Sequence, residues 1–372
     1  MTKICLNMIV KDEAHVVERA LRSVCDFIAD YVILDTGSSD DTPAVIESFM
    51  RNKNIPGKVY SGDWVNFSQA RNRALELARQ NSDSDYVLLI DADDELACTE
   101  PEAYSSLDPA IECYTIQKAY GSIVYFAPFL LNIRRRKWKW RGPVHEYIGP
   151  EDSNPHRASI LQGSRILCLG GGARSLGKTQ REKYLADAEL LEQELITDPD
   201  NARSRFYLAQ SYRDAGEHEL AIEHYRKRVE MGGWEEETFV AQLESARQMM
   251  RNGYPYERFL PEFLKAYEMR PSRIEPLYEL TAYCRKQDLF HQGYLFGKTA
   301  LGMELPPDTL FVSKYMYDYG LMDEFSLCAY WAGRYQESYD CCLSLLSSKL
   351  TPSEHKPRIG QNLGFAAAQL GH

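Results

Sequence analysis

Two different patterns of apolar and polar positions divide this chain. Up to about residue 165, short apolar runs alternate with stretches in which apolar residues recur every three or four positions. Runs of the first kind predict buried strands, and stretches of the second kind predict amphipathic helices. Strands are expected over residues 3–10, 30–35, 57–63 and 85–91, and helices over residues 14–27, 42–51 and 67–80.

The strand centres in this first part are apolar without interruption, as in "DYVILD" and "DYVLLID". Strands that are buried on both faces read this way because helices cover both sides of a parallel sheet. The sequence therefore predicts an α/β N-terminal domain with a mainly parallel sheet.

The pattern becomes helical from about Lys178 to the end of the chain. One buried stripe is expected along residues 183–195, and residues 204–233 follow the offsets of a tetratricopeptide repeat. The residues at those offsets are Leu208, Ala209, Tyr212, Gly216, Ala221 and Tyr225. We expect a domain over residues 1–168, a linker over 169–180 and an all-α, TPR-like domain over 181–372; a helical bundle without repeat geometry is the alternative.

Composition and charge limit the function classes. The chain has 372 residues, 44% of them hydrophobic, and a net charge of -11, so a general affinity for nucleic acid or anionic membranes is not expected. Nine cysteines without a C-x-x-C pair suggest free thiols of a cytosolic protein. No segment approaches the roughly 20 apolar residues of a membrane span, so a cytoplasmic location is expected.

Acidic residues follow two of the expected strands. Asp35 and Asp91 each end an apolar strand, and ligands of open parallel sheets bind outside these carboxyl ends. If "DADDE" is extended, Asp91 and Asp93 point to the same side and can share a divalent cation that also binds diphosphate oxygens. Arg71, at the start of the preceding helix, carries a permanent charge suited to phosphate or to a base edge.

At this point the chain resembles a known family. The motifs "NMIVKDE", "DTGSSDDT", "ARNRAL" and "LLIDADDE", in this order, resemble the inverting, nucleotide-sugar-dependent glycosyltransferases of family 2, which have a GT-A fold. With "GPVHEYI" and a tetratricopeptide region, the chain is similar to the repeat-containing branch, which includes peptide S-glycosyltransferases acting on bacteriocin precursors. The resemblance implies metal-dependent transfer from a nucleotide sugar, a UDP-sugar foremost, to a peptide, protein or saccharide acceptor.

The resemblance also implies roles for individual residues at the donor. Val10 and Glu13 would lie at the base and ribose, and Asp35 would accept a hydrogen bond from uracil. Arg71 would contact the base or the phosphates. Asp91 and Asp93 would hold Mn²⁺ or Mg²⁺ against the diphosphate.

An inverting transferase also needs a general base. His145 and Glu146, if extended, point to opposite sides, and we expect Glu146 to be the base and His145 to lie near the diphosphate or the metal. Asp94 is the competing base, whereas Glu95 is expected to face water.

Two further stretches resemble motifs of other functions. "RRRKWKWRG" is as basic as a nucleic-acid patch, but Trp138 and Trp140 share one face of a period-two pattern, which favours a half-buried strand. Residues 172–179, "GARSLGKT", have the spacing of a phosphate-binding loop, yet only helices are expected after them. We interpret this second stretch as part of the linker.

Three functional hypotheses follow from the sequence. The leading one is a glycosyltransferase whose helical domain recruits the acceptor or forms a homodimer. The second is a helical-repeat adaptor that carries an inactive transferase domain. The third is a nucleotidyltransferase. Such an enzyme would ordinarily have a glycine-rich basic loop after the first strand, and "MIVKDEAHV" contains no glycine.

Overall fold

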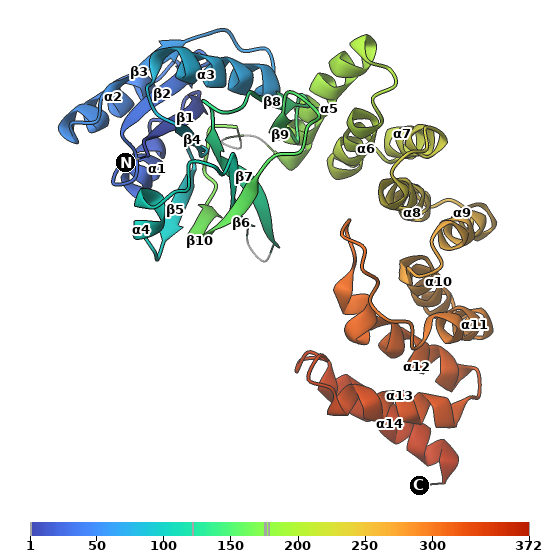
Figure 1. Ribbon diagram of the computed structural model, residues 1–372. Helices are drawn as coiled ribbons and strands as arrows, with labels where there is room; N and C mark the ends of the chain where they lie inside the picture. Colours follow the sequence, from blue (N-terminus) through green and yellow to red (C-terminus); the bar gives the residue numbers. More distant parts are fainter. Residues whose placement is uncertain (1, 121–122, 175–176, 178, 372) are drawn as a thin grey trace. The chain divides into compact units, whose positions relative to one another are not determined.

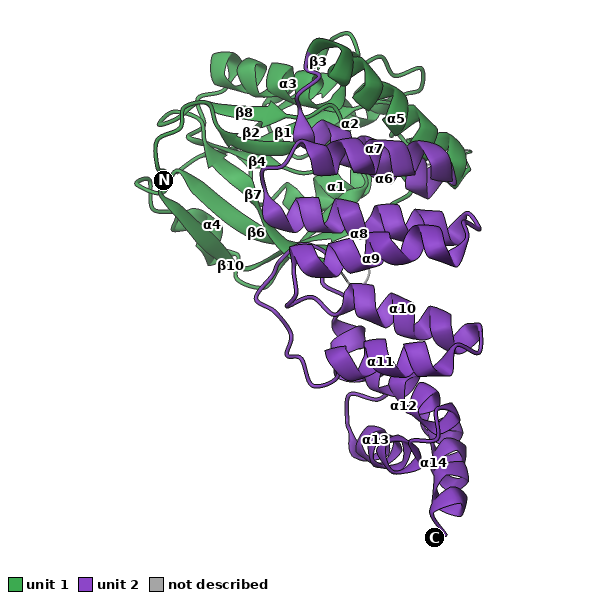
Figure 2. Cartoon of the chain, turned by 90° about the vertical axis from the view of Figure 1, so that its right-hand side faces the viewer, with its two compact units in different colours: residues 1–197 green, residues 198–372 purple. Residues whose placement is uncertain are grey.

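The computed structural model describes residues 2–120, 123–174, 177 and 179–371. The chain divides into two compact units, unit 1 over Met1–Thr197 and unit 2 over Asp198–His372 (Figure 2). Helix α5, Gln180–Thr197, therefore groups with unit 1, whereas the sequence places most of it in the helical domain. The functional domain limits expected from the sequence stay a prediction.

Unit 1 is built on an eight-stranded sheet of order β3-β2-β1-β4-β7-β6-β10-β5 (Figure 1). Strands β3, β2, β1 and β4 are parallel to their neighbours in this series, and β10 is parallel to β6. Antiparallel pairs join β4 to β7, β7 to β6 and β10 to β5. The strands are β1 Ile4–Val10, β2 Asp30–Asp35, β3 Gly57–Ser61, β4 Tyr86–Leu89, β5 Asp94–Cys98, β6 Cys113–Tyr120, β7 Ile123–Asn132 and β10 Ala158–Cys168.

Helices cover both faces of this sheet. Alternate residues of β1 point to opposite sides, so Leu6 belongs to one buried cluster and Cys5 to the other. The first cluster contains apolar residues of α1 and α2, and the second contains those of α3. The helices are α1 Val17–Val24, α2 Thr42–Asn52, α3 Phe67–Asn81 and the short α4 Glu102–Ser105. The predicted α/β class is confirmed.

A buried amide fixes α3 to the sheet. The Asn7 side chain donates hydrogen bonds to the Val32 carbonyl at 3.0 Å and to the Ala74 carbonyl of α3 at 2.9 Å. Both bonds satisfy a side chain that is only 3% exposed. The helix that carries Arg71 is thereby held against the middle of β1 and β2.

Strands β8, Trp138–Arg141, and β9, Tyr147–Pro150, form a separate antiparallel pair beside α3. Trp138 and Trp140 are buried, whereas Lys139 between them is exposed. Both tryptophans pack in the cluster that includes apolar residues of α3. The interpretation of this basic stretch as a half-buried strand is confirmed.

Unit 2 consists of helices joined by turns and loops, and each described α-helix packs against the next one along the chain. This succession confirms the helical-repeat character expected from the sequence. The helices are α6 Ala202–Ala215, α7 His218–Glu230, α8 Glu235–Arg251, α9 Tyr256–Met269, α10 Glu275–Lys286, α11 Phe290–Ala300, η1 Met316–Gly320, α12 Leu321–Trp331, α13 Tyr335–Ser347 and α14 Lys356–Leu370.

All nine cysteines are free thiols, as the sequence predicts. Within the described ranges, none of the helices has the length and apolar character that crossing a bilayer would require.

Candidate active site

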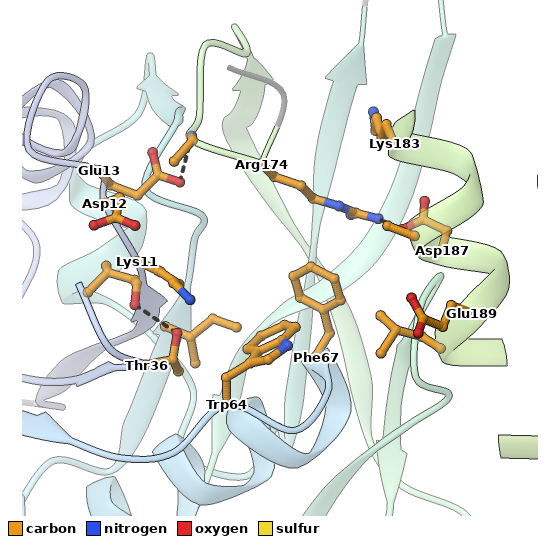
Figure 3. Close-up of a pocket in the computed structure, with 15 residues that line it drawn as sticks. Lys11, Asp12, Glu13, Thr36, Trp64, Phe67, Arg174, Lys183, Asp187 and Glu189 are labelled. Atoms are coloured by element: carbon orange, nitrogen blue, oxygen red, sulfur yellow. Dashed lines mark hydrogen bonds and ion pairs between the residues drawn. The ribbon is translucent and has the colours of Figure 1, made fainter. Parts of the chain in front are cut away.

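Two pockets open beyond the carboxyl ends of the neighbouring strands β1 and β4. The β1 pocket has a volume of about 560 Å³, and the β4 pocket has a volume of about 310 Å³. The β1 pocket is lined by Ile9, Val10, Lys11, Asp12, Glu13, Thr36, Trp64, Phe67, Ala173, Arg174, Lys183, Ala186, Asp187, Glu189 and Leu190 (Figure 3). The β4 pocket is lined by Arg71, Leu89, Ile90, Asp91, Lys118, Tyr125, Ala127, Pro128, Phe129, Trp140, His145, Glu146, Tyr147 and Ile148.

The floor of the β1 pocket joins the ends of two strands. The backbone N–H and the hydroxyl of Thr36 donate to the Val10 carbonyl at 2.9 and 3.1 Å. The rings of Trp64 and Phe67 meet edge to face with centroids 4.8 Å apart, and they form an aromatic wall (Figure 3). A flat ligand can stack on such a wall.

Helix α5 supplies the opposite wall of the β1 pocket. Asp187 of this helix forms an ion pair with Arg174, whose guanidinium lies 4.6 Å from the centroid of the Phe67 ring. Lys183 also comes from α5 and lines the pocket (Figure 3). The sequence pattern places most of α5 in the helical domain, and neither Trp64 nor Phe67 is among the residues expected at the site, so both walls were missed.

Asp35 is held in the turn that follows β2. Its carboxylate accepts hydrogen bonds from the Ser38 backbone N–H at 3.1 Å and from the Ser38 hydroxyl at 2.5 Å, and the residue is 7% exposed. Asp35 does not line the β1 pocket, although Val10 and Glu13 do. Its role as the uracil acceptor stays a prediction.

Glu13 and Asp93 meet at the segment around Gly172. The Ala173 N–H donates to Glu13 Oε1 at 3.1 Å, and the Gly172 N–H donates to Asp93 Oδ2 at 3.3 Å. A Cβ on Gly172 would lie 2.8 Å from Asp93 Oδ2 and 3.2 Å from Glu13 Oε1, so both carboxylates crowd this glycine. Burial, together with the charge of Asp93, raises the pKa of Glu13 to about 6.

Five charged side chains form a continuous network at the β4 pocket. Arg71 donates through Nε to Glu146 Oε1 at 2.8 Å and through Nη2 to Asp91 Oδ1 at 2.7 Å. Lys118 Nζ lies 3.1 Å from Asp91 Oδ2 and 2.8 Å from Asp94 Oδ2. The network therefore links the two candidate bases, Glu146 and Asp94, through the acid that ends the β4 segment.

The network shifts the pKa values of its acids in opposite directions. Burial alone would raise the pKa of Asp91, but the charges of Arg71 and Lys118 hold it well below its ordinary value. Burial and the nearby Asp91 charge raise the pKa of Asp94 to about 6, against the influence of Lys118. Of these two acids, Asp91 therefore stays ionised over the whole neutral range, and Asp94 has the pKa closer to neutrality.

The expectation that Asp91 and Asp93 point to the same side is wrong, because the chain turns between them. Residues 92 and 93 form a turn, and the Asp94 N–H donates to the Asp91 carbonyl at 3.1 Å before β5 begins. Asp91 consequently contacts Arg71 and Lys118, whereas Asp93 contacts Gly172.

The expectation of an extended backbone at His145 and Glu146 is also wrong. His145 adopts a φ of 51°, in the left-handed region, so the alternation of an extended chain does not apply there. Both residues nevertheless line the β4 pocket. Asp94, by contrast, is 3% exposed and lines neither pocket.

The described residues contain no group of three or more His, Cys, Asp or Glu side chains that could hold a metal ion. Asp91, Asp93 and His145 are therefore not assembled as one set of metal ligands. Glu13 and Asp93 fit a divalent ion better, because Glu13 Oε2 is buried and has no hydrogen-bond partner among the described residues. One or two carboxylates suffice for Mg²⁺ when phosphate oxygens and water complete the coordination.

Lys118 is the network residue that sequence reasoning missed. It lies on β6, in "CYTIQKAY", where the alternate residues Tyr114 and Ile116 are buried. A lysine at the next inward position of a half-buried strand is unusual unless it is paired. The alternation of buried positions along β6 was therefore the sequence signal that could have identified Lys118 as a paired, inward-facing lysine.

Comparison with known proteins identifies the first part of the chain. Residues 5–138 match the family model described as glycosyl transferase family 2. Unit 1 therefore contains a family 2 glycosyltransferase domain, which confirms the resemblance seen in the sequence.

Two curated relatives are similar to parts of the chain. A TPR repeat-containing protein of Synechococcus elongatus is 34% identical over 154 residues, which cover 40% of this chain and 36% of the relative. The prophage-derived glycosyltransferase SunS of Bacillus subtilis is 24% identical over 233 residues, which cover 61% of this chain and 53% of the relative. The chain thus spans about a third to a half of the length of these relatives.

Solved structures give weaker likenesses. TarS 1–349 of S. aureus in complex with UDP-GlcNAc has a TM-score of 0.40 at 14% identity, covering 68% of this chain and 93% of that chain. The mannosyltransferase PcManGT of Pyrobaculum calidifontis in complex with GDP-Man and Mn²⁺ has a TM-score of 0.36 at 11% identity, covering 90% of this chain and 86% of that one.

Proposed function

We propose that this protein is a metal-dependent glycosyltransferase that moves a sugar from a nucleotide-sugar donor to a nucleophilic acceptor with inversion. The observation that carries the proposal is the position of Glu146. Its carboxylate is held by Arg71 at the β4 pocket, one strand away from the β1 pocket, in a chain whose first unit contains a family 2 glycosyltransferase domain.

The β1 pocket is the proposed donor nucleotide site. Its volume falls within the usual range of about 300 to 1,000 Å³ for small-molecule pockets. Val10 contacts the nucleoside, and the base stacks on the wall of Trp64 and Phe67. A UDP-sugar is the first donor to test, and Asp35, at the end of β2, is the proposed acceptor for the uracil N–H.

Asp93 and Glu13 are the proposed ligands of Mn²⁺ or Mg²⁺. Such an ion, when bound, stabilises the negative charge that develops on the departing diphosphate. The Gly172 and Ala173 N–H groups orient the two carboxylates through the hydrogen bonds described above. Asp91, neutralised by Arg71 and Lys118, shapes the neighbouring β4 pocket instead.

Glu146 is the proposed general base. Oε1 accepts from Arg71, and among the described residues Oε2 has no hydrogen-bond partner, so it can receive the acceptor proton. The acceptor atom forms its bond to the anomeric carbon from one face while the bond to the diphosphate oxygen breaks on the other. Nucleoside diphosphate leaves, and the proton stays on Glu146.

The acceptor is proposed to be a peptide, a protein or a saccharide, recruited by the helical unit. Homodimer formation is the second role proposed for that unit. A truncated chain ending near residue 197 tests the first of these roles. If this chain still hydrolyses the donor but no longer transfers the sugar to the acceptor, the helical unit recruits the acceptor.

One experiment tests the activity directly. The protein is incubated with UDP- and GDP-sugars in Mn²⁺ or Mg²⁺, and released nucleoside diphosphate is measured alongside Glu146→Gln. We expect release from at least one donor and none from the variant. If no donor binds or is hydrolysed under any of these conditions, the adaptor hypothesis replaces this one.

A further inference from the structure

Arg71 and Lys118, the arginine and lysine that line the β4 pocket, both form ion pairs with acidic side chains. Arg71 serves Asp91 and Glu146, and Lys118 serves Asp91 and Asp94, at N to O distances between 2.7 and 3.1 Å. These are the arginine and the lysine among the described lining residues. His145, exposed at the same pocket, has an interaction of its own.

These ion pairs are shielded from water. The side chains of Arg71 and Lys118 are 15% and 11% exposed, that of Asp94 is 5% exposed, and only Asp91, at 34%, is partly open to solvent. A ligand carboxylate entering this pocket would lose its own hydration and meet two lining acids, Asp91 and Glu146, whose cations are already occupied, with Asp94 behind Lys118. Neutral hydroxyl groups avoid this cost, because they donate to carboxylate oxygens and accept from N–H groups.

We propose that the β4 pocket receives the transferred sugar as an uncharged hexose and excludes uronate sugars, with the Lys118–Asp94 ion pair as the determinant of that choice. This inference rests on the proposed function. Lys118 acts as a positioning residue: it fixes Asp91 and Asp94, and its charge is thereby withheld from the ligand.

UDP-glucose and UDP-glucuronate test the proposal because they differ only at C6, where a hydroxymethyl group is replaced by a carboxylate. Their dissociation constants are measured by calorimetry at pH 8 with Mg²⁺, with UDP as the reference. We expect glucuronate binding to be weaker by about tenfold or more, since unmatched like charges in a desolvated site are repelled. Equal or tighter binding of UDP-glucuronate overturns the proposal.

Two variants locate the determinant. Asp94→Asn releases Lys118 from one of its two acids, so the ratio of the two dissociation constants should fall towards one. Lys118→Gln removes the cation and should raise the ratio. Glu95→Gln is the matched control, because it removes one acid from the same strand at the neighbouring position, and its ratio should equal that of the wild type.

The outcomes also separate this inference from the proposed function. If Asp94→Asn is folded and keeps the wild-type ratio, the Lys118–Asp94 pair is not the determinant and the proposal fails, while glycosyl transfer stands. If Asp94→Asn does not fold, the wild-type ratio and Lys118→Gln decide the question. If UDP does not bind, the same comparison is made with GDP-mannose and GDP-mannuronate, and failure of both nucleotides counts against the proposed function itself.

Discussion

The β1 and β4 pockets lie at the ends of adjacent strands but are built in different ways. The β1 pocket has the larger volume of the two, and its aromatic wall lies opposite α5, which carries Lys183 and Asp187. The β4 pocket is narrower, and its charges come from α3, β6 and the segments after β4 and before β9. A wide pocket with an aromatic face suits a flat base, whereas a fixed set of charges is preorganised for a reaction that displaces charge.

The sharpest test of this division replaces the proposed base in the β4 pocket. Glu146→Gln preserves shape and the contact to Arg71 but cannot take a proton, so kcat should fall by about 100-fold or more. The dissociation constant of UDP, which lacks the sugar and is proposed to bind in the β1 pocket, should change less than about twofold. Single-turnover transfer and nucleotide calorimetry measure the two quantities. Turnover near the wild-type rate would assign the base elsewhere, with Asp94 as the next candidate.

The next largest effect is expected at the proposed metal ligand Asp93, which contacts Gly172. Asp93→Asn removes one negative charge from a site with few protein ligands, so the Mn²⁺ concentration required for half-maximal donor binding should rise by about 30-fold. Electron paramagnetic resonance of free Mn²⁺ gives a readout that does not depend on turnover. Asp12→Asn, an acid that lines the β1 pocket without contacting Gly172, is the control. Unchanged Mn²⁺ affinity in Asp93→Asn would contradict the assignment.

A smaller effect is expected from the aromatic wall of the β1 pocket. Trp64→Ala should weaken donor binding by about tenfold, since stacking of a base on an aromatic side chain contributes about 1–3 kcal/mol. Trp64→Phe keeps a ring and should recover most of the affinity. Calorimetry with UDP, which lacks the sugar, confines the measurement to this pocket. The wall has no role in base binding if Trp64→Ala binds UDP as the wild type does.

The smallest expected effect concerns the pH dependence of stability. The pKa of Asp94 is raised to about 6 in the folded protein, above the value of about 3.9 expected in an unfolded chain. Its stabilising contribution is therefore complete below about pH 4 and is lost as the pH rises through about 6. Asp94→Asn removes this loss, so its melting temperature should decline less between pH 4 and pH 7. Thermal unfolding at four pH values measures the melting temperatures, with Glu95→Gln as the reference variant. An equal or steeper decline of the melting temperature in Asp94→Asn would contradict this prediction.

Periodicity alone predicted the elements of unit 1 up to β4, together with β8, but not β5, β6, β7, β9 or β10. The apolar runs gave β1 and β2 almost to the residue, and the alternation around Trp138 and Trp140 gave β8. These elements are readable because each one buries a face whose repeat is visible in about ten residues. The same reasoning identified the acid-ended strands that border the two pockets.

The charge network was beyond the reach of such reasoning for two physical reasons. The turn at Ala92 and Asp93 breaks the alternation from which the orientation of the acids was inferred. Lys118 reaches Asp91 from a strand two places away in the sheet, across β7, and only the strand order brings the two together. Asp35, by contrast, is bound by Ser38 three residues later, a local contact that the sequence itself suggests.

Gly172 gives an independent way to control the metal-binding region. It is the first glycine of the stretch that imitates a phosphate-binding loop, yet the structure accounts for it by the approach of two carboxylates. Among the atoms that an added methyl group would meet, the nearest is Asp93 Oδ2, a side-chain atom, so alanine at this position would require that carboxylate to shift. Substitution of Gly172 could thus change the position of the Asp93 carboxylate at the proposed metal site by steric displacement, while every acid in the sequence stays in place.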